Sequence, residues 1–128
     1  MKKTLCACAI AALVPLAAPV AAQGYIDSYR AYISRDDVVN SNGVRLRDVG
    51  AILRQDRANV HRYGIRQRGD EVDPYFGEPF LREMLQKAVN DSAIPGYIEE
   101  AIIYGNAMLT VRLYGEGDTL LYVDITMD

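Results

Sequence analysis

Four basic side chains recur at helical spacing in one stretch of the chain and are the strongest candidates for chemistry. On a helix, Arg47, Arg54, Arg57 and the single histidine, His61, fall along one edge because steps of three, four and seven residues separate them. The planar guanidinium group of arginine grips phosphate, sulfate or carboxylate groups through paired hydrogen bonds. We therefore predict that this edge binds an anionic ligand or a partner protein. The alternative is a solvated helix face paired with acids elsewhere.

Asp56 lies in the same segment, close to the apolar stripe of Leu53 and Val60. A carboxylate is costly to bury unless it is paired. We predict that Asp56 is a structural brace, paired with an arginine or with backbone, that fixes the helix against residues 62–68. Five residues separate Asp56 from His61, which places the two side chains about 140° apart on a helix. They are therefore not expected to form a catalytic pair.

An enzymatic interpretation uses His61 with a carboxylate from the acidic segment that follows it. Asp70, Glu71 and Asp73 lie nine to twelve residues further on, and a loop could bring one of them close to the imidazole. The alternative site is thus His61 with Asp73, in a small hydrolase or lyase. However, the sequence has no nucleophile motif, metal-ligand spacing or cofactor fingerprint. We therefore predict no metal and no cofactor, and a binding protein before an enzyme.

The charge is distributed unevenly. Residues 23–128 contain 12 basic and 17 acidic side chains, a net charge of −5. Seven arginines and only two acids lie between Arg45 and Arg68, so this segment is basic within an acidic chain. An acidic chain argues against general binding to nucleic acid or anionic membranes. The predicted partner is an envelope protein or an anionic component of the cell envelope.

The first 22 residues have the layout of a cleavable bacterial signal peptide. Lys2 and Lys3 precede an apolar run, residues 5–14, and small residues lead to Ala22. The run is shorter than the roughly 20 apolar residues that a membrane-spanning helix needs. We expect cleavage before Gln23, a periplasmic location and no transmembrane segment in the mature chain. Both cysteines would be removed with the signal peptide, so the mature domain would be cysteine-free.

Hydrophobic periodicity predicts two helices in the middle of the chain. The first covers residues 48–63, with Asp48 as its N-cap and Gly64 as its C-terminal stop. The second begins near Pro79, a residue suited to the first turn of a helix, and ends at residues 90–96.

Alternating apolar residues predict a C-terminal hairpin, with strands near residues 108–114 and 120–126. Residues 97–104 are predicted to form a third strand. The opening segment, residues 25–33, fits a strand or a helix, and its aromatic content favours a strand. These elements predict one α+β domain, residues 23–128, with two helices packed on one face of a small, mainly antiparallel sheet. The edge of the final hairpin could also pair two copies into a homodimer.

Overall fold

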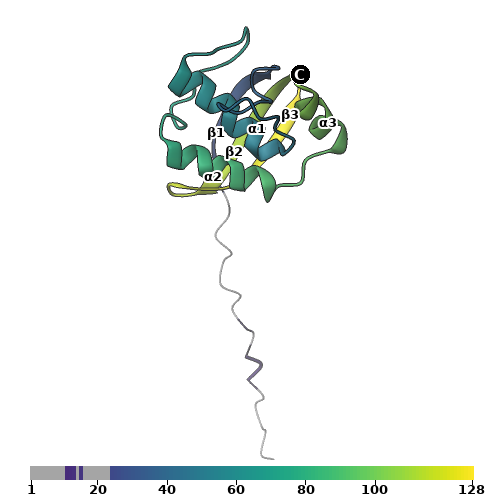
Figure 1. Ribbon diagram of the computed structural model, residues 1–128. Helices are drawn as coiled ribbons and strands as arrows, with labels where there is room; N and C mark the ends of the chain where they lie inside the picture. The colour runs from purple at the N-terminus through teal and green to yellow at the C-terminus, as the bar shows by residue number, and fades with distance from the viewer. Residues whose placement is uncertain (1–10, 14, 16–23) are drawn as a thin grey trace, which may run out of the picture.

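The computed structural model describes residues 11–13, 15 and 24–128, and the predicted signal peptide, residues 1–22, lies almost entirely outside this part. The elements follow in the order β1 (Gly24–Ile33), α1 (Val49–Ala58), η1 (Asn59–Tyr63), α2 (Pro79–Asn90), α3 (Gly96–Tyr104), β2 (Ala107–Glu116) and β3 (Thr119–Met127) (Figure 1). Helices and an antiparallel sheet are therefore combined in one chain, and the predicted α+β class is confirmed. None of the helices in the described ranges is long and apolar enough to cross a membrane.

The sheet has three strands in the order β1-β2-β3, and both pairs are antiparallel. The opening segment is therefore a strand, as its aromatic content indicated. Alternate residues of β2 are buried, because successive side chains of a strand point to opposite faces of the sheet. The buried side chains of the three strands, Tyr29, Val111 and Ile125 among them, belong to one hydrophobic cluster.

The helices α1 and α2 begin close to their predicted positions. The Asp48 side chain accepts a hydrogen bond from the Ala51 amide at 2.9 Å, which caps α1 as the sequence indicated. The last turn is wider than expected, because Asn59–Tyr63 is π-helical before Gly64 ends the segment with φ of 66°. This π-helical turn carries His61.

The prediction of a strand at residues 97–104 is wrong, since Gly96–Tyr104 forms helix α3. Ile98 and Ile102 are its buried residues and lie four positions apart, on one face of a helix. Pro95 is the N-cap residue and Gly105 ends the helix with φ of 84°. The isoleucines and tyrosines favour strands in isolation, but burial at a spacing of four selects a helix here.

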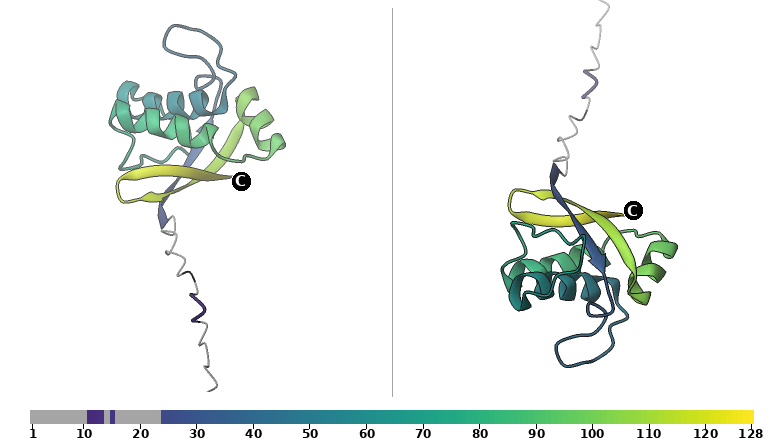
Figure 2. Two further views of the ribbon diagram at one scale, coloured as in Figure 1. Left: turned by 90° about the horizontal axis from the view of Figure 1, so that it is seen from below. Right: turned by 90° about the horizontal axis from the view of Figure 1, so that it is seen from above.

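The helices and the sheet share one hydrophobic core. In Figure 2, α1 and α2 lie side by side next to the strands. Leu53 of α1, Leu85 of α2 and Leu109 of β2 are all fully buried in the same cluster. The two helices approach closely at Gly50, where an added Cβ atom would lie 2.6 Å from the backbone oxygen of Gln86. A larger residue at position 50 would therefore force α1 and α2 apart.

The segment between η1 and α2 runs along the outer edge of β1. The Glu71 amide donates to the carbonyl oxygen of Arg30 at 2.9 Å. The Tyr32 amide donates to Asp70 Oδ1 at 2.7 Å. These bonds cover backbone groups that an edge strand would otherwise expose. They also place Asp73 next to the first helix, which determines the geometry of the site.

Candidate functional site

Arg57 is the centre of a buried ionic cluster between α1, β1 and the acidic segment. Its side chain is fully buried. Its Nε donates to Asp56 Oδ2 at 2.7 Å, and its Nη1 donates to Asp73 Oδ2 at 2.9 Å and to the Glu71 carbonyl oxygen at 2.8 Å. The guanidinium carbon lies 4.3 Å from the centre of the Tyr29 ring, a cation–π contact. Arg57 thus ties three parts of the fold together.

The pKa values of the two carboxylates in this cluster are shifted in opposite directions. Burial raises the pKa of Asp56 to about 7, although the adjacent Arg57 charge opposes this shift. Burial also disfavours the ionised form of Asp73, but hydrogen bonds from His61, the Phe76 amide and Arg57 outweigh it and hold the pKa below its ordinary value of 3.8. Arg57 itself stays charged, since the carboxylates raise its pKa further despite its burial. Asp73 is therefore the ionised partner of Arg57, and Asp56 titrates near neutral pH.

The structure brings His61 and Asp73 together, as the enzymatic interpretation required. The Nε2 atom of His61 lies 2.7 Å from Asp73 Oδ2. The same oxygen accepts from Arg57, and Asp73 Oδ1 accepts from the Tyr75 and Phe76 amides at 2.9 and 2.6 Å. The carboxylate is thus fully used in holding the segment in place. Neither His61 nor Asp73 lines the groove or the apolar pocket described below.

A groove between α1 and α2 gathers a different set of basic side chains. It has a volume of about 370 Å³. Its lining residues between Ala51 and Tyr63 recur at steps of three and four positions, and so do its lining residues on α2. Each set therefore lies on one face of its helix. The residues that line this α1–α2 groove are Asn40, Ser41, Leu46, Ala51, Arg54, Gln55, Ala58, Arg62, Tyr63, Pro79, Arg82 and Gln86.

Three arginines line this groove and no acidic residue does. Within the described ranges, Arg54, Arg62 and Arg82 form no ion pair with a carboxylate within 4.0 Å. Arg82 is only 5% exposed, and its Nη1 donates to the carbonyl oxygens of Phe76 and Gly77 at 2.9 and 3.0 Å. The groove therefore has a positive charge that the protein does not neutralise by direct contact.

The four residues predicted to share one binding edge are not brought together. Arg54 lines the α1–α2 groove, whereas Arg57 is buried in the ionic cluster and His61 contacts Asp73. A separation of three residues turns the helix by about 60°, which is enough to send Arg57 into the core while Arg54 stays at the groove. Arg47 is exposed and lines a separate pocket with Asp48 and Glu99.

Asp56 is buried and paired with an arginine, as predicted, but it does not itself brace α1 against residues 62–68. Its carboxylate accepts from the neighbouring Arg57, on the same helix. The segment that is anchored to α1 lies further along the chain, before α2. Arg57 binds it through the Asp73 carboxylate and the Glu71 carbonyl oxygen. The brace between α1 and the segment before α2 is therefore formed by Arg57, with Asp73 as its ionised partner.

Arg62 and Arg82 line the groove but were not among the predicted binding residues, and Arg82 also lies outside the basic segment. Arg82 had the weaker sequence signal of the two. It lies on α2, 28 positions after Arg54, so its contribution depends on how the two helices pack. The one available signal was its position on α2, where it lies three residues from Pro79 and four from Gln86, the other groove residues of that helix. Among the residues that the structure describes, no group of three or more His, Cys, Asp or Glu side chains is arranged to hold a metal ion.

Comparison of the chain with protein-family models, with curated proteins and with solved structures gives no match.

Proposed function

We propose that this chain is an exported periplasmic binding protein whose α1–α2 groove holds an anionic group of an envelope ligand. One observation carries the proposal. Three arginine residues, Arg54, Arg62 and Arg82, line a single groove that has no acidic lining residue. The signal peptide predicted from residues 1–22 supports the compartment.

Two arginines of the groove, Arg54 and Arg62, have N–H donors available for a ligand. Arg54 donates from Nη1 to Gln86 Oε1 at 3.0 Å, which leaves the other N–H groups of its fork available. The side chain of Arg62 is exposed and lies against the ring of Tyr63. A phosphate or carboxylate group in the groove could therefore accept paired hydrogen bonds from at least two guanidinium groups. Arg82 is almost fully buried and its Nη1 donates to two backbone carbonyl oxygens, so it adds positive charge to the groove while Arg54 and Arg62 supply the donors.

The surroundings favour selective binding over general attraction. The mature chain carries a net charge of −5, so polyanions such as nucleic acids are repelled by most of its surface. In the proposed arrangement α1 and α2 cover one face of the sheet, and residues of both helices line the groove. The close approach at Gly50 holds the two helices at a spacing that keeps Arg54 and Arg82 on the same groove.

The hydrolase or lyase alternative gains one supporting contact, the 2.7 Å approach of His61 to Asp73. It has less support than the groove for a physical reason. Asp73 already accepts bonds from Arg57 and from two backbone amides, so it holds the fold rather than remaining available as a base. We therefore place the enzymatic function second.

The test compares two double variants of the purified protein with equal changes in charge. Arg54→Gln/Arg62→Gln removes two cations of the groove, and Arg47→Gln/Arg68→Gln removes two exposed arginines outside it. Binding of inorganic phosphate, sulfate and citrate is measured by calorimetry and by NMR shifts of the arginine Nε–H groups. We expect the groove variant to lower the affinity for the preferred anion about tenfold or more, and the control variant to change it less than threefold.

Equal losses in the two variants would mean that the anions respond to overall charge and not to the groove. Absence of binding to all three anions at millimolar concentration would reject the proposal. Far-UV circular dichroism of both variants shows whether the fold is retained, which is expected because both pairs replace side chains that are at least partly exposed.

A further inference from the structure

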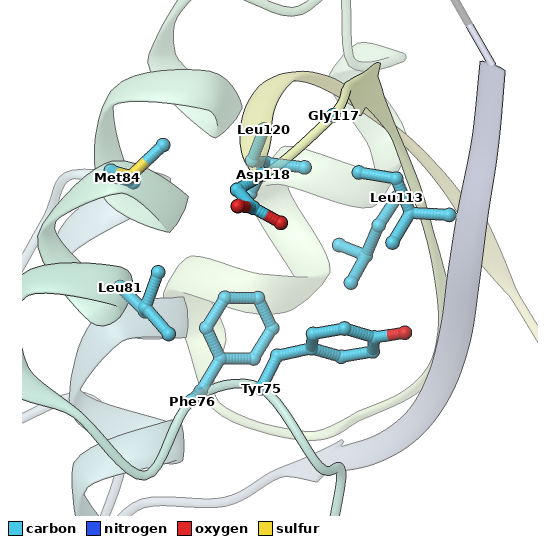
Figure 3. Close-up of a pocket in the computed structure, with 9 residues that line it drawn as sticks. Tyr75, Phe76, Leu81, Met84, Leu113, Gly117, Asp118 and Leu120 are labelled. Atoms are coloured by element: carbon cyan, nitrogen blue, oxygen red, sulfur yellow. The ribbon is translucent and has the colours of Figure 1, made fainter.

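A second cavity shares no lining residue with the α1–α2 groove, although α2 contributes to both. It is bounded by α2, by the segment that precedes α2, and by the turn between β2 and β3 (Figure 3). Its volume is about 240 Å³. Seven of its nine lining residues are aliphatic or aromatic, Phe76, Met84 and Leu113 among them. We call it the apolar pocket.

Two irregularities of the sheet shape this pocket. The pairing of β1 with β2 shifts register at Ile26, which lies between Tyr25 and Asp27, and the Ile26 side chain lines the pocket. The pairing of β2 with β3 shifts between Tyr114 and Gly115. A Cβ atom at Gly115 would lie 3.0 Å from Ile26 Cδ1 and would also clash with the Thr119 carbonyl oxygen. Bulges of this kind redirect side chains and are frequent beside binding sites.

The size and lining of the pocket suit a small apolar group. An apolar cavity of about 150 Å³ is sufficient to bind benzene. The apolar pocket is larger, and its aromatic and sulfur-containing walls offer good contacts to a ring or a short alkyl chain.

One charged side chain distinguishes the pocket from a packing defect. Asp118, in the turn between β2 and β3, points its carboxylate toward the cavity (Figure 3). No basic residue lines the pocket, and within the described part of the chain Asp118 forms no ion pair within 4.0 Å. A carboxylate beside apolar walls attracts a ligand that combines a cation with an apolar body.

We propose that the apolar pocket binds a small amphiphilic amine, with its apolar part against Phe76 and Met84 and its ammonium group paired with Asp118. The turn leaves Asp118 exposed, so the ammonium group would remain partly hydrated while the apolar part is buried. The carboxylate then supplies selectivity for the cation, and the apolar walls supply most of the affinity.

The test compares 4-phenylbutylamine with the neutral 4-phenylbutan-1-ol, which has a similar size and shape. Affinities are measured by NMR titration of the purified protein, and the amides of Leu113 and Gly117 report the location. We expect the amine to bind about fivefold more tightly than the alcohol, the ratio that a partly exposed ion pair supports. Asp118→Asn should abolish this preference and leave the alcohol unaffected. Met84→Trp should fill the pocket and weaken both compounds at least tenfold.

Equal affinities of the amine and the alcohol for the unmodified protein would overturn the proposal. Shifts confined to residues outside the pocket, or no binding of either compound, would overturn it as well. Asp118 is an exposed turn residue, so the Asp118→Asn protein is expected to fold and provides the decisive comparison even if Met84→Trp disturbs packing. Binding of anions in the α1–α2 groove is measured separately, so failure of one proposal leaves the other intact.

Discussion

Replacement of Asp56 by asparagine should make the stability of this protein less dependent on pH. Asp56 is completely buried beside Arg57, and burial raises its pKa from 3.8 to about 7. The charge of Arg57 is already matched by Asp73, whose pKa is lowered. Ionisation of Asp56 therefore adds a second buried negative charge to a cluster with one arginine. Asparagine mimics the protonated acid in shape and cannot ionise.

The sign and size of the effect follow from the shift in pKa. Because the folded state holds the proton more tightly than the unfolded state, the contribution of Asp56 to stability is fully present below pH 3.8 and is lost as the pH rises to about 7. Each pKa unit corresponds to about 1.4 kcal/mol. Between pH 5 and pH 8, about two pH units lie below the folded-state pKa of Asp56, which is about 7. The free energy of unfolding should therefore fall by about 3 kcal/mol over this range because of Asp56.

The assay is urea denaturation of the unmodified protein and of Asp56→Asn at pH 5, 6, 7 and 8, followed by far-UV circular dichroism. Burial also raises the pKa of Asp37, so the informative quantity is the difference between the two proteins at each pH. We expect the free energy of unfolding of Asp56→Asn, relative to that of the unmodified protein, to rise by about 3 kcal/mol from pH 5 to pH 8. A difference that stays constant over this range would show that Asp56 does not titrate there, and it would refute the reasoning. Asp73 does not confuse the result, because its lowered pKa affects stability only in more acidic solution.

Three further substitutions test the packing and the ionic cluster. Gly50→Ala should lower the free energy of unfolding by about 1–3 kcal/mol, measured in urea, because its Cβ atom meets the Gln86 backbone; unchanged stability would contradict the close approach of the helices. Tyr29→Phe should change stability by less than about 1 kcal/mol, since the buried hydroxyl has no hydrogen-bond partner in the described structure, and a larger loss by the same assay would reveal an unrecognised partner. Arg57→Met should cost about 3–5 kcal/mol at pH 7, because it leaves the buried Asp73 without its cation; a thermal melt close to that of the unmodified protein would show that the cluster does not brace the fold.

Several elements could be predicted from local sequence patterns, because the signals that mark them come from residues close together in the sequence. Asp48 caps α1 through a bond to Ala51, three positions away, and Gly64 ends the helical segment in the left-handed conformation. The helix at Gly96–Tyr104 was mistaken for a strand because strand propensity and helical periodicity conflict in a short apolar segment. Burial of Ile98 and Ile102 in the core decides that conflict, and burial is not a local property.

The candidate site depended even more on packing. The sequence identified the basic segment and the contrast between its charge and that of the rest of the chain. It could not separate Arg54, at the groove, from Arg57, which is buried, because a charged side chain is ordinarily expected to face solvent. The partner that makes burial of Arg57 tolerable, Asp73, lies 16 residues away and reaches it only because the segment is bound along β1.

The amino-acid sequence by itself determined the class of the fold, the caps of the first helix, the hairpin and the location of the basic segment. These features arise from composition, periodicity and local hydrogen bonding. Only the tertiary structure decided which arginines face a groove, which one is buried, and where the apolar pocket opens. The physical reason is that the cost of a charge or a cavity depends on residues that are distant in sequence, such as Arg82 and Arg54 in one groove and Asp118 and Met84 in one pocket.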